Sequence, residues 1–243
     1  MSQRMQSNPD IATISALIGE PARAKMLVAL LAGKALTATE LAIEADITCQ
    51  TASSHLHKLV AKGMLAVAKQ GRHKYFQLGG TAVAELLEAL LNVSAQDIQL
   101  KTNAGPEDSR LRNARVCYDH LAGELGVLLL DTLEAQKLMT RRHHTLHLTR
   151  AGSQFFDCSG AGIEELLNKR RPLCKACLDW SVRRHHLAGS LGNWILNDLF
   201  RRRWAQRELD SRAIRFTRTG LRNFVAFYKL PEHNPVIRSA SVE

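Results

Sequence analysis

The second half of the chain contains an internal repeat. The segment 119–139 reads DHLAGELGVLLLDTLEAQKLM and the segment 185–205 reads HHLAGSLGNWILNDLFRRRWA, so both carry the pattern H-L-A-G-x-L-G. Each is followed by a similar stretch, LHLTRAGSQFF or IRFTRTGLRNF. Such a duplication predicts two copies of one structural unit that bury their apolar faces against each other. We therefore expect residues 113–230 to form one domain built from two related halves.

Each repeat also resembles an earlier part of the chain. LHKLVAKGML (56–65) and LLDTLEAQKLM (129–139) have their leucines in step, and both lead to a strand-like segment and then a helix. We predict that the repeats are degenerate winged-helix-like units. Their helix faces, AGELGVLLL and AGSLGNWIL, lack polar residues that could read DNA. The pattern predicts close backbone packing, or alternatively a ligand approaching the main chain, at Gly123, Gly126, Gly189 and Gly192.

The first part of the chain has a series of short helical patterns. Thr37 and Glu40 have the spacing of a capping box, which opens a helix that ends near Asp46. Thr48 can cap the next helix, which contains the stretch CQTASSHLHKL (49–59). The apolar stripe of this helix consists of Ala52, Leu56 and Leu59. The opposite face is polar but poor in charge, which is unusual for a face that only contacts water.

A β-hairpin follows these helices. LAVAKQGRHKYFQL (65–78) alternates apolar and polar residues on either side of a basic tip. Two helices joined by a turn and followed by such a hairpin predict a winged helix-turn-helix, whose second helix enters the major groove of DNA while the wing contacts the backbone. The predicted DNA contacts are Thr48, Gln50, Thr51, Ser53, Ser54, His55 and Lys58 on the helix, and Lys69, Arg72, His73 and Lys74 on the wing.

These assignments have plainer alternatives. Serine and threonine favour the first turns of helices, so the polar stretch can be a solvated helix start. His55 adjoins Leu56 and can simply pack against the domain. The basic hairpin tip can be an ordinary exposed turn. The order of helix, turn, helix and wing favours DNA binding over each of these.

Charge and composition agree with a nucleic-acid partner. The 243-residue chain has a formal net charge of +10 at pH 7, which favours a polyanion such as double-stranded DNA. It contains no apolar run near the length of a membrane span and no secretory leader. We therefore expect a cytoplasmic protein without a membrane partner.

Residues 14–78 resemble the arsenical-resistance repressor (ArsR/SmtB) family of bacterial transcription factors. The resemblance rests on three motifs in register at the family spacing, G-E-P-x-R, T-x-x-E-L and S-x-H-L-x-K-L-x-x-x-G. It implies a winged helix-turn-helix fold and a homodimer that binds an inverted repeat in operator DNA. It also implies repression that lasts until an inducer weakens the complex.

The chain departs from the family at its metal sites. The Cys-x-Cys pair that the resemblance would place before the reading helix is replaced by TELAIEAD, and the Asp and His of the last helix by TAVAELLEALL. Neither inducer site can be carried over, so the inducer is unknown. Cys49 is the one thiol of this domain, and we expect it to be a half-buried small residue.

The resulting prediction is a mainly α chain with small β-hairpins, in the α+β class. A winged helix-turn-helix domain spans 10–97, and a polar linker containing Gly105 and Pro106 spans 98–112. The duplicated effector and dimerisation domain spans 113–230, and a tail spans 231–243.

The five cysteines are not spaced as a disulfide framework. Cys174 and Cys177 form a C-x-x-C pair, but no second pair completes a zinc site. Long members of the same family resemble this chain in R-x-C-Y-D-H-L-A-G and A-C-L-D-W-S-x-R-R-x-H-L-A-G. That resemblance implies one cysteine at the start of each repeat, Cys117 and Cys177, with Cys174 as an addition.

Histidines lie near these cysteines in the sequence. If Cys117 and Cys177 meet close to an imidazole, the pocket would suit a soft metal such as zinc or cadmium, whereas two bare thiols would suit reversible oxidation. A solvated or phosphate-facing position is the alternative for the histidines. The candidate metal ligands are Cys117, Cys174, Cys177, His120 and His186.

The sequence thus predicts a homodimeric, sequence-specific DNA-binding regulator. We expect a repressor that is released when an effector acts on the C-terminal domain. A metal or thiol-redox sensor that uses Cys117 and Cys177 is the alternative. A remote alternative is an enzyme using the same cysteines and histidines, although no nucleophile, base and orienting acid stand at a recognisable spacing.

Overall fold

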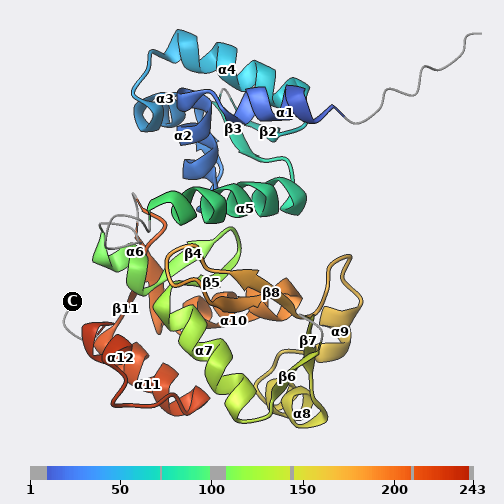
Figure 1. Cartoon of the computed structure of the whole chain (residues 1–243), viewed down its shortest axis with the longest axis vertical. Coiled ribbons are helices and arrows are strands. Elements are labelled where there is room, and N and C mark those ends of the chain that lie inside the picture. The colour runs from blue at the N-terminus through green and yellow to red at the C-terminus, as the bar shows by residue number, and fades with distance from the viewer. Residues whose placement is uncertain (1–9, 72, 99–107, 143–144, 209–210, 241–243) are drawn as a thin grey trace, which may run out of the picture. The chain divides into compact units, whose positions relative to one another are not determined.

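The computed structural model describes residues 10–71, 73–98, 108–142, 145–208 and 211–240 (Figure 1). The chain divides into two compact units, 1–87 and 88–243, with the boundary inside helix α5 (Thr81–Ile98). This boundary precedes the predicted linker 98–112. The second half of α5 belongs to the second unit, because Glu88 pairs with Arg212 and the side chain of Asn92 donates to the carbonyl of Leu178. Within that linker, 99–107 lie outside the described residues and 109–113 form a short helix.

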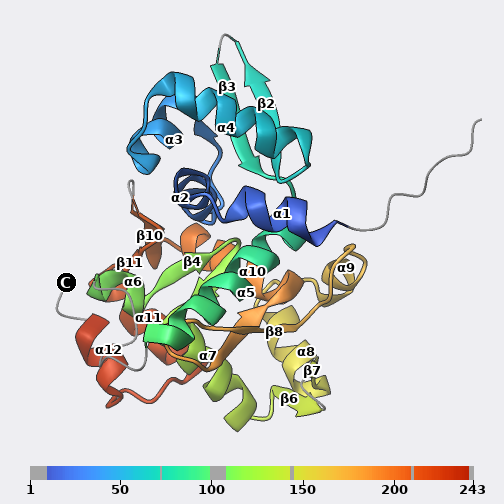
Figure 2. The ribbon, with the colours of Figure 1, turned by 45° about the horizontal axis from the view of Figure 1, so that its top comes forward.

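The first unit is a winged helix-turn-helix. Three strands form an antiparallel sheet in the order β1-β3-β2, and the β2–β3 wing extends beyond α4 (Figure 2). The elements are α1 (Ile11–Ile18), α2 (Pro21–Leu30), β1 (Leu36–Thr37), α3 (Ala38–Ala45), α4 (Cys49–Ala61), β2 (Leu65–Gln70), β3 (His73–Leu78) and the start of α5.

Local capping explains where these helices begin and end. Thr37 and Glu40 form the predicted capping box at the start of α3. Asp46 ends α3 in the left-handed conformation, with φ of 56°, and so makes the tight turn before α4. Thr48 accepts a hydrogen bond from the backbone N–H of Thr51 and caps α4, as predicted.

The second unit consists of two repeats with the same order of elements. The first contains α6 (Ser109–Asn113), β4 (Arg115–Cys117), β5 (His120–Ala122), α7 (Glu124–Ala135), β6 (Met139–Arg142), β7 (Thr145–Leu148) and α8 (Arg150–Cys158). The second contains α9 (Ile163–Leu167), β8 (Lys175–Leu178), β9 (His185–Ala188), α10 (Gly189–Arg201), β10 (Ala205–Arg207), β11 (Ile214–Phe216) and α11 (Arg218–Tyr228). A last helix, α12, spans Pro235–Ala240.

Each repeat contains the second helix, the hairpin and the following helix of a winged unit, which are α7, β6–β7 and α8 in the first repeat and α10, β10–β11 and α11 in the second. A two-stranded hairpin, β4–β5 or β8–β9, stands where the first helix of a helix-turn-helix would be. The predicted class, helical with small antiparallel hairpins, is confirmed. Across the described part of the chain, no helix has both the length and the apolar character needed to cross a bilayer.

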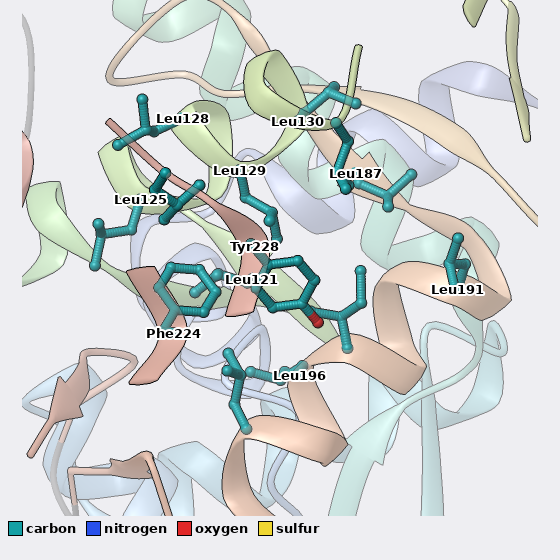
Figure 3. Close-up of a cluster of buried hydrophobic side chains, with 14 of the residues drawn as sticks. Leu121, Leu125, Leu128, Leu129, Leu130, Leu187, Leu191, Leu196, Phe224 and Tyr228 are labelled. Atoms are coloured by element: carbon teal, nitrogen blue, oxygen red, sulfur yellow. The ribbon is translucent and has the colours of Figure 1, made fainter. Parts of the chain in front are cut away.

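The two repeats share one hydrophobic core (Figure 3). α7 and α10 lie at its centre and are buried over most of their surfaces. Their equivalent side chains, together with one aromatic residue from each following helix, include Leu125, Leu129, Leu191, Ile195, Phe156 and Phe224. Because neither repeat could bury these side chains alone, the duplication is required for the stability of the unit.

The glycines of H-L-A-G-x-L-G allow this close packing. A Cβ atom on Gly126 would lie 2.6 Å from the carbonyl oxygen of Leu121 and 3.5 Å from Cβ of His186. A Cβ atom on Gly192 would lie 2.4 Å from the carbonyl oxygen of Leu187 and 3.4 Å from Cβ of His120. Each glycine therefore leaves room for a backbone carbonyl of its own repeat, with the histidine of the other repeat next to it, which supports the packing interpretation.

Candidate functional site

The polar face of α4 is exposed, whereas its apolar stripe is buried. Ala52, Leu56 and Leu59 lie in the core of the first unit. Gln50, Ser54 and Lys58 are exposed on the other side of the helix. A glutamine of this kind can form two hydrogen bonds with an adenine edge, and serine and lysine suit base or phosphate contacts.

Other predicted contacts on α4 are already engaged within the first unit. Thr48 caps the helix, and its hydroxyl lies 2.9 Å from that of Thr51. The hydroxyl of Ser53 donates to the backbone carbonyl of Cys49 at 2.9 Å. His55 is half-buried, with Nδ1 3.1 Å from Nη1 of Arg23. We infer that Thr48 and His55 mainly shape the helix, while Gln50, Ser54 and Lys58 face outward.

The G-E-P-x-R motif holds His55 in this position. Glu20 accepts hydrogen bonds from the backbone N–H groups of Ala22 and Arg23, and so caps α2. Arg23 donates to the carbonyl oxygens of Ala16 and Leu17 at the end of α1. The motif thus fixes α1 and α2 against the reading helix.

A groove separates α4 from the wing. It has a volume of about 530 Å³. Its lining is mainly apolar, with Leu56, Val60, Val67 and Phe76, and also includes Ser53, His57, Lys69, His73 and Lys74. Lys69, His73 and Lys74 are exposed. Arg72, the remaining predicted wing contact, lies outside the described residues. We use the name reading surface for Gln50, Ser54 and Lys58 of α4 together with Lys69, His73 and Lys74 of the wing.

The second unit brings four of the predicted metal ligands together. Cys117 is paired across β4–β5 with His120, and Cys177 is paired across β8–β9 with His186. One potential ligand atom from each residue lies within 4.8 Å of the others. The two Sγ atoms are 3.9 Å apart and the two Nε2 atoms are 3.1 Å apart. We call these four residues the Cys/His cluster.

The Cys/His cluster is shielded from water. Cys117, His120 and His186 are buried, and Cys177 is half-buried. Four protein ligands are the number found in closed structural metal sites, whereas a catalytic zinc centre has three and an open position. The adjoining space between Leu121, Gly126, Leu187 and Gly192 holds no cavity large enough for a water molecule.

Each histidine of the cluster has a carboxylate beside its second ring nitrogen. Nδ1 of His120 lies 3.1 Å from Oδ1 of Asp119, and Nδ1 of His186 lies 3.2 Å from Oδ2 of Asp179. The second contact is an ion pair whose geometry is too bent for a regular hydrogen bond. Carboxylates in these positions turn Nε2 of both rings toward the cysteines.

The carboxylates are in turn held by arginines of the opposite repeat. Arg115 of β4 donates to Asp179 at 2.8 Å, and both side chains are fully buried. Arg171, which precedes β8, pairs with Asp119. The N–H of Gly123 at the start of α7 also donates to Asp179, at 2.8 Å. These links between the repeats make the cluster a rigid, preformed group.

The electrostatics of the cluster favour a thiolate beside an imidazolium. A hydrogen bond from Cys117 and the two nearby histidines lower the pKa of Cys177 despite its burial. The same hydrogen bond, together with burial, raises the pKa of Cys117. Burial lowers the pKa of His186, but Asp179 and Cys177 outweigh burial and raise it. The imidazolium of His186 thus lies close to the thiolate of Cys177.

The remaining cysteines lie elsewhere. Cys174 belongs to the hydrophobic core, where burial raises the pKa of its thiol to about 12, so the structure does not bring this candidate ligand to the cluster. Cys49, which was expected to be half-buried, is exposed, as is Cys158.

Sequence reasoning missed the carboxylates. A signal was present, because Asp119 and Asp179 each stand two positions after the cluster cysteine, in the shared pattern C-x-D.

Comparisons with known proteins identify the family. A helix-turn-helix domain family matches residues 18–68. The HTH-type transcriptional regulator YdfF of Bacillus subtilis (strain 168) is 39% identical over 213 residues, which cover 88% of this chain and 94% of YdfF.

Two solved structures resemble the first part of the chain. The homodimeric winged helix-turn-helix DNA-binding domain (fragment 1–100) of Mb0332 from Mycobacterium bovis, a possible ArsR-family regulator, is 24% identical. It covers 42% of this chain and 100% of its own, with a TM-score of 0.33. The cadmium sensor CMTR from Mycobacterium tuberculosis is 23% identical and covers 40% of this chain and 94% of its own, with a TM-score of 0.29.

YdfF is matched over most of both chains, so the likeness includes the duplicated second unit as well as the DNA-binding unit. The chain therefore belongs to the family of HTH-type transcriptional regulators, and its first unit has the winged helix-turn-helix fold that its N-terminal motifs predict.

Proposed function

We propose that this regulator is a homodimeric repressor that reads operator DNA with α4 and is released by an effector acting on the second unit. The observation that carries the proposal is the reading surface. It combines an outward-facing glutamine, serine and lysine on α4 with a basic wing across an open groove. Such a surface fits base contacts from the helix and phosphate contacts from the wing.

An apolar face on α5 supports dimerisation. Leu86, Leu90 and Val93 have helical spacing, and between 39% and 60% of each side chain is exposed. A row of exposed apolar side chains on one helix fits a second copy of the chain better than it fits water. A two-fold dimer would place two α4 helices on half-sites about 34–36 Å apart along the DNA.

The second unit is poorly suited to reading DNA itself. α7 and α10, which correspond in order to α4, are buried in the core with mostly apolar side chains. The unit instead contains the Cys/His cluster, a preformed set of polar groups joining the two repeats. The buried helices and the Cys/His cluster together support an effector role for the second unit.

Replacing Gln50 with alanine is expected to weaken binding to the preferred DNA duplex by about 1–3 kcal/mol and to leave binding to random DNA nearly unchanged. Lys74→Ala should weaken both and lower the slope of log affinity against log salt by about 1. The duplex would be obtained by selection from a random pool with the full-length protein, and binding followed by fluorescence anisotropy.

Lys169→Ala is the matched control for loss of charge, because Lys169 is exposed in the second unit, outside the reading surface. It should leave the salt slope unchanged. Equal losses on selected and random DNA for Gln50→Ala would show that this residue does not read bases. Failure to select any preferred duplex would refute the proposed function.

A further inference from the structure

We propose that Cys117, His120, Cys177 and His186 bind one soft divalent metal ion of the zinc and cadmium class, and that this ion is the effector of the regulator. The second part of this inference rests on the proposed repressor function. The first part rests on the geometry of the second unit alone.

The sulfur–sulfur and nitrogen–nitrogen distances in the Cys/His cluster fit a tetrahedral ion. With metal–sulfur bonds of about 2.3 Å and metal–nitrogen bonds of about 2.0–2.1 Å, a tetrahedral site sets its sulfurs about 3.8 Å apart and its nitrogens about 3.3 Å apart. The two Sγ atoms are 3.9 Å apart and the two Nε2 atoms are 3.1 Å apart. Two thiolates and two imidazoles are ligands that suit zinc and cadmium.

The groups around the cluster are arranged as the surroundings of a metal site. Asp119 and Asp179 occupy the Nδ1 sides of the two rings, which leaves both Nε2 atoms for coordination. Their charges are balanced by Arg171 and Arg115. A divalent cation would in turn balance the two thiolates, so the complete buried site would carry no net charge.

The facing histidines provide a separate indication of a cation. Two Nε2 atoms at 3.1 Å with both lone pairs turned inward repel each other unless a proton or a metal ion lies between them. Both rings are buried, so water cannot separate them. A metal ion satisfies both nitrogens and both sulfurs at once, whereas a shared proton satisfies only the nitrogens.

The strands that carry the cysteines are connected to the part of α5 that belongs to the second unit, from Glu88 onward. The side chain of Arg212 pairs with Glu88 of α5. The backbone carbonyl of Arg212 accepts a hydrogen bond from the N–H of Val116, which precedes Cys117. Asn92 of α5 donates to the carbonyl of Leu178, next to Cys177. A shift of β4 or β8 on metal binding would therefore act on α5 directly.

The metal site is tested with the full-length protein and zinc or cobalt(II) as the probe. Native mass spectrometry should show one zinc per chain, with the loss of one proton for each coordinating thiol. Cobalt(II) should give the visible bands of a tetrahedral ion and thiolate charge-transfer absorption. Cys117→Ser with Cys177→Ser should abolish both signals, whereas Cys158→Ser, which removes an exposed thiol elsewhere, should keep them.

Circular dichroism of the double variant shows whether it folds. If it does not fold, His120→Gln and His186→Gln serve as separate ligand variants, and each should lose the tetrahedral cobalt spectrum. Metal binding that survives in a folded double cysteine variant would overturn the site. A Cys117–Cys177 disulfide in protein purified with both zinc and a reductant would overturn it as well.

The effector role is tested by anisotropy on the selected duplex, with zinc or with a chelator. Saturating zinc should weaken operator binding of the wild type about 5–150-fold and leave the double cysteine variant unaffected. Tight zinc binding without any change in operator affinity would overturn the effector role. Absence of specific DNA binding in both states would instead refute the repressor proposal, while the mass and cobalt data would still decide the metal site.

A smaller change tests the role of Asp119 as a positioning residue. Asp119→Asn keeps an oxygen that can accept from Nδ1 of His120 but removes the charge that supports it. We expect metal affinity to fall about 10–100-fold, with the tetrahedral cobalt spectrum retained. Unchanged affinity would show that this carboxylate does not orient the ligand.

Discussion

Replacing Asp179 with alanine is expected to lower the free energy of unfolding of the second unit by about 3–5 kcal/mol. The carboxylate is fully buried and accepts hydrogen bonds from Arg115 and from the N–H groups of Gly123, Ser181 and Val182. Its removal would leave the guanidinium of Arg115, which is 1% exposed, without its ion-pair partner. An uncompensated buried charge costs much more than the intact pair contributes.

The measurement can be confined to the second unit. All three tryptophans, Trp180, Trp194 and Trp204, lie within it, so tryptophan fluorescence during urea denaturation reports on this unit alone. Contacts with His186 and Arg115 lower the pKa of Asp179 despite its burial. Its stabilising contribution is therefore complete at neutral pH and is lost only as the pH falls well below the pKa of an unfolded aspartate.

Asp131→Ala is the control for this prediction. Asp131 pairs with Arg184 at 2.7 Å, but both side chains are substantially exposed. Exposed pairs contribute about 0–1 kcal/mol, so this variant should unfold almost like the wild type. A similar small loss for Asp179→Ala would mean that the buried ion pair does not hold the two repeats together.

Gly192→Ala is expected to destabilise the second unit by about 3 kcal/mol or more. Alanine is the better helix former by about 1 kcal/mol, so propensity alone predicts the opposite sign. The new Cβ would lie 2.4 Å from the carbonyl oxygen of Leu187, and backbone cannot move aside as a flexible side chain can. Because Leu187 follows His186 in β9, the clash should displace this ligand, so metal affinity should fall together with stability.

Gly160→Ala separates this steric effect from backbone strain. No heavy atom lies within 4 Å of a Cβ at Gly160, but its φ of 89° is strained for alanine. The expected loss is about 1–2 kcal/mol, with metal affinity unchanged. If Gly192→Ala costs no more than Gly160→Ala, the close approach of the Leu187 carbonyl is not the reason for the glycine. Urea denaturation and zinc titration measure both effects.

The first unit was predictable because its signals are local. The capping box of Thr37 and Glu40, the cap at Thr48 and the alternation in the wing each act within a few residues. The order of elements then predicts which helix reads DNA. The half-buried position of His55 was not predictable in the same way, because it depends on a contact with Arg23, which is distant in the sequence but adjacent in space.

The Cys/His cluster could be predicted only in part. The cysteines are 60 positions apart and the histidines 66, because the second hairpin has a longer connection between its strands. This change of spacing hides the equivalence of Cys117–His120 and Cys177–His186 in an alignment on H-L-A-G. Whether the hairpins meet depends on how α7 packs against β9 and α10 against β5, which periodicity does not specify. The burial of Arg115 beside Asp179 likewise follows only from that packing.

The reciprocal packing of the repeats is that of an isologous dimer joined into one chain. The histidine of each half packs against a glycine of the other half, and an arginine of each half pairs with the aspartate of the other. Each half also contributes two of the four residues of the Cys/His cluster. In separate chains, such an assembly would form and dissociate with protein concentration. The covalent link replaces that equilibrium with a fixed, high local concentration of the second half. The cluster should therefore remain assembled at the few copies per cell at which a regulator can act.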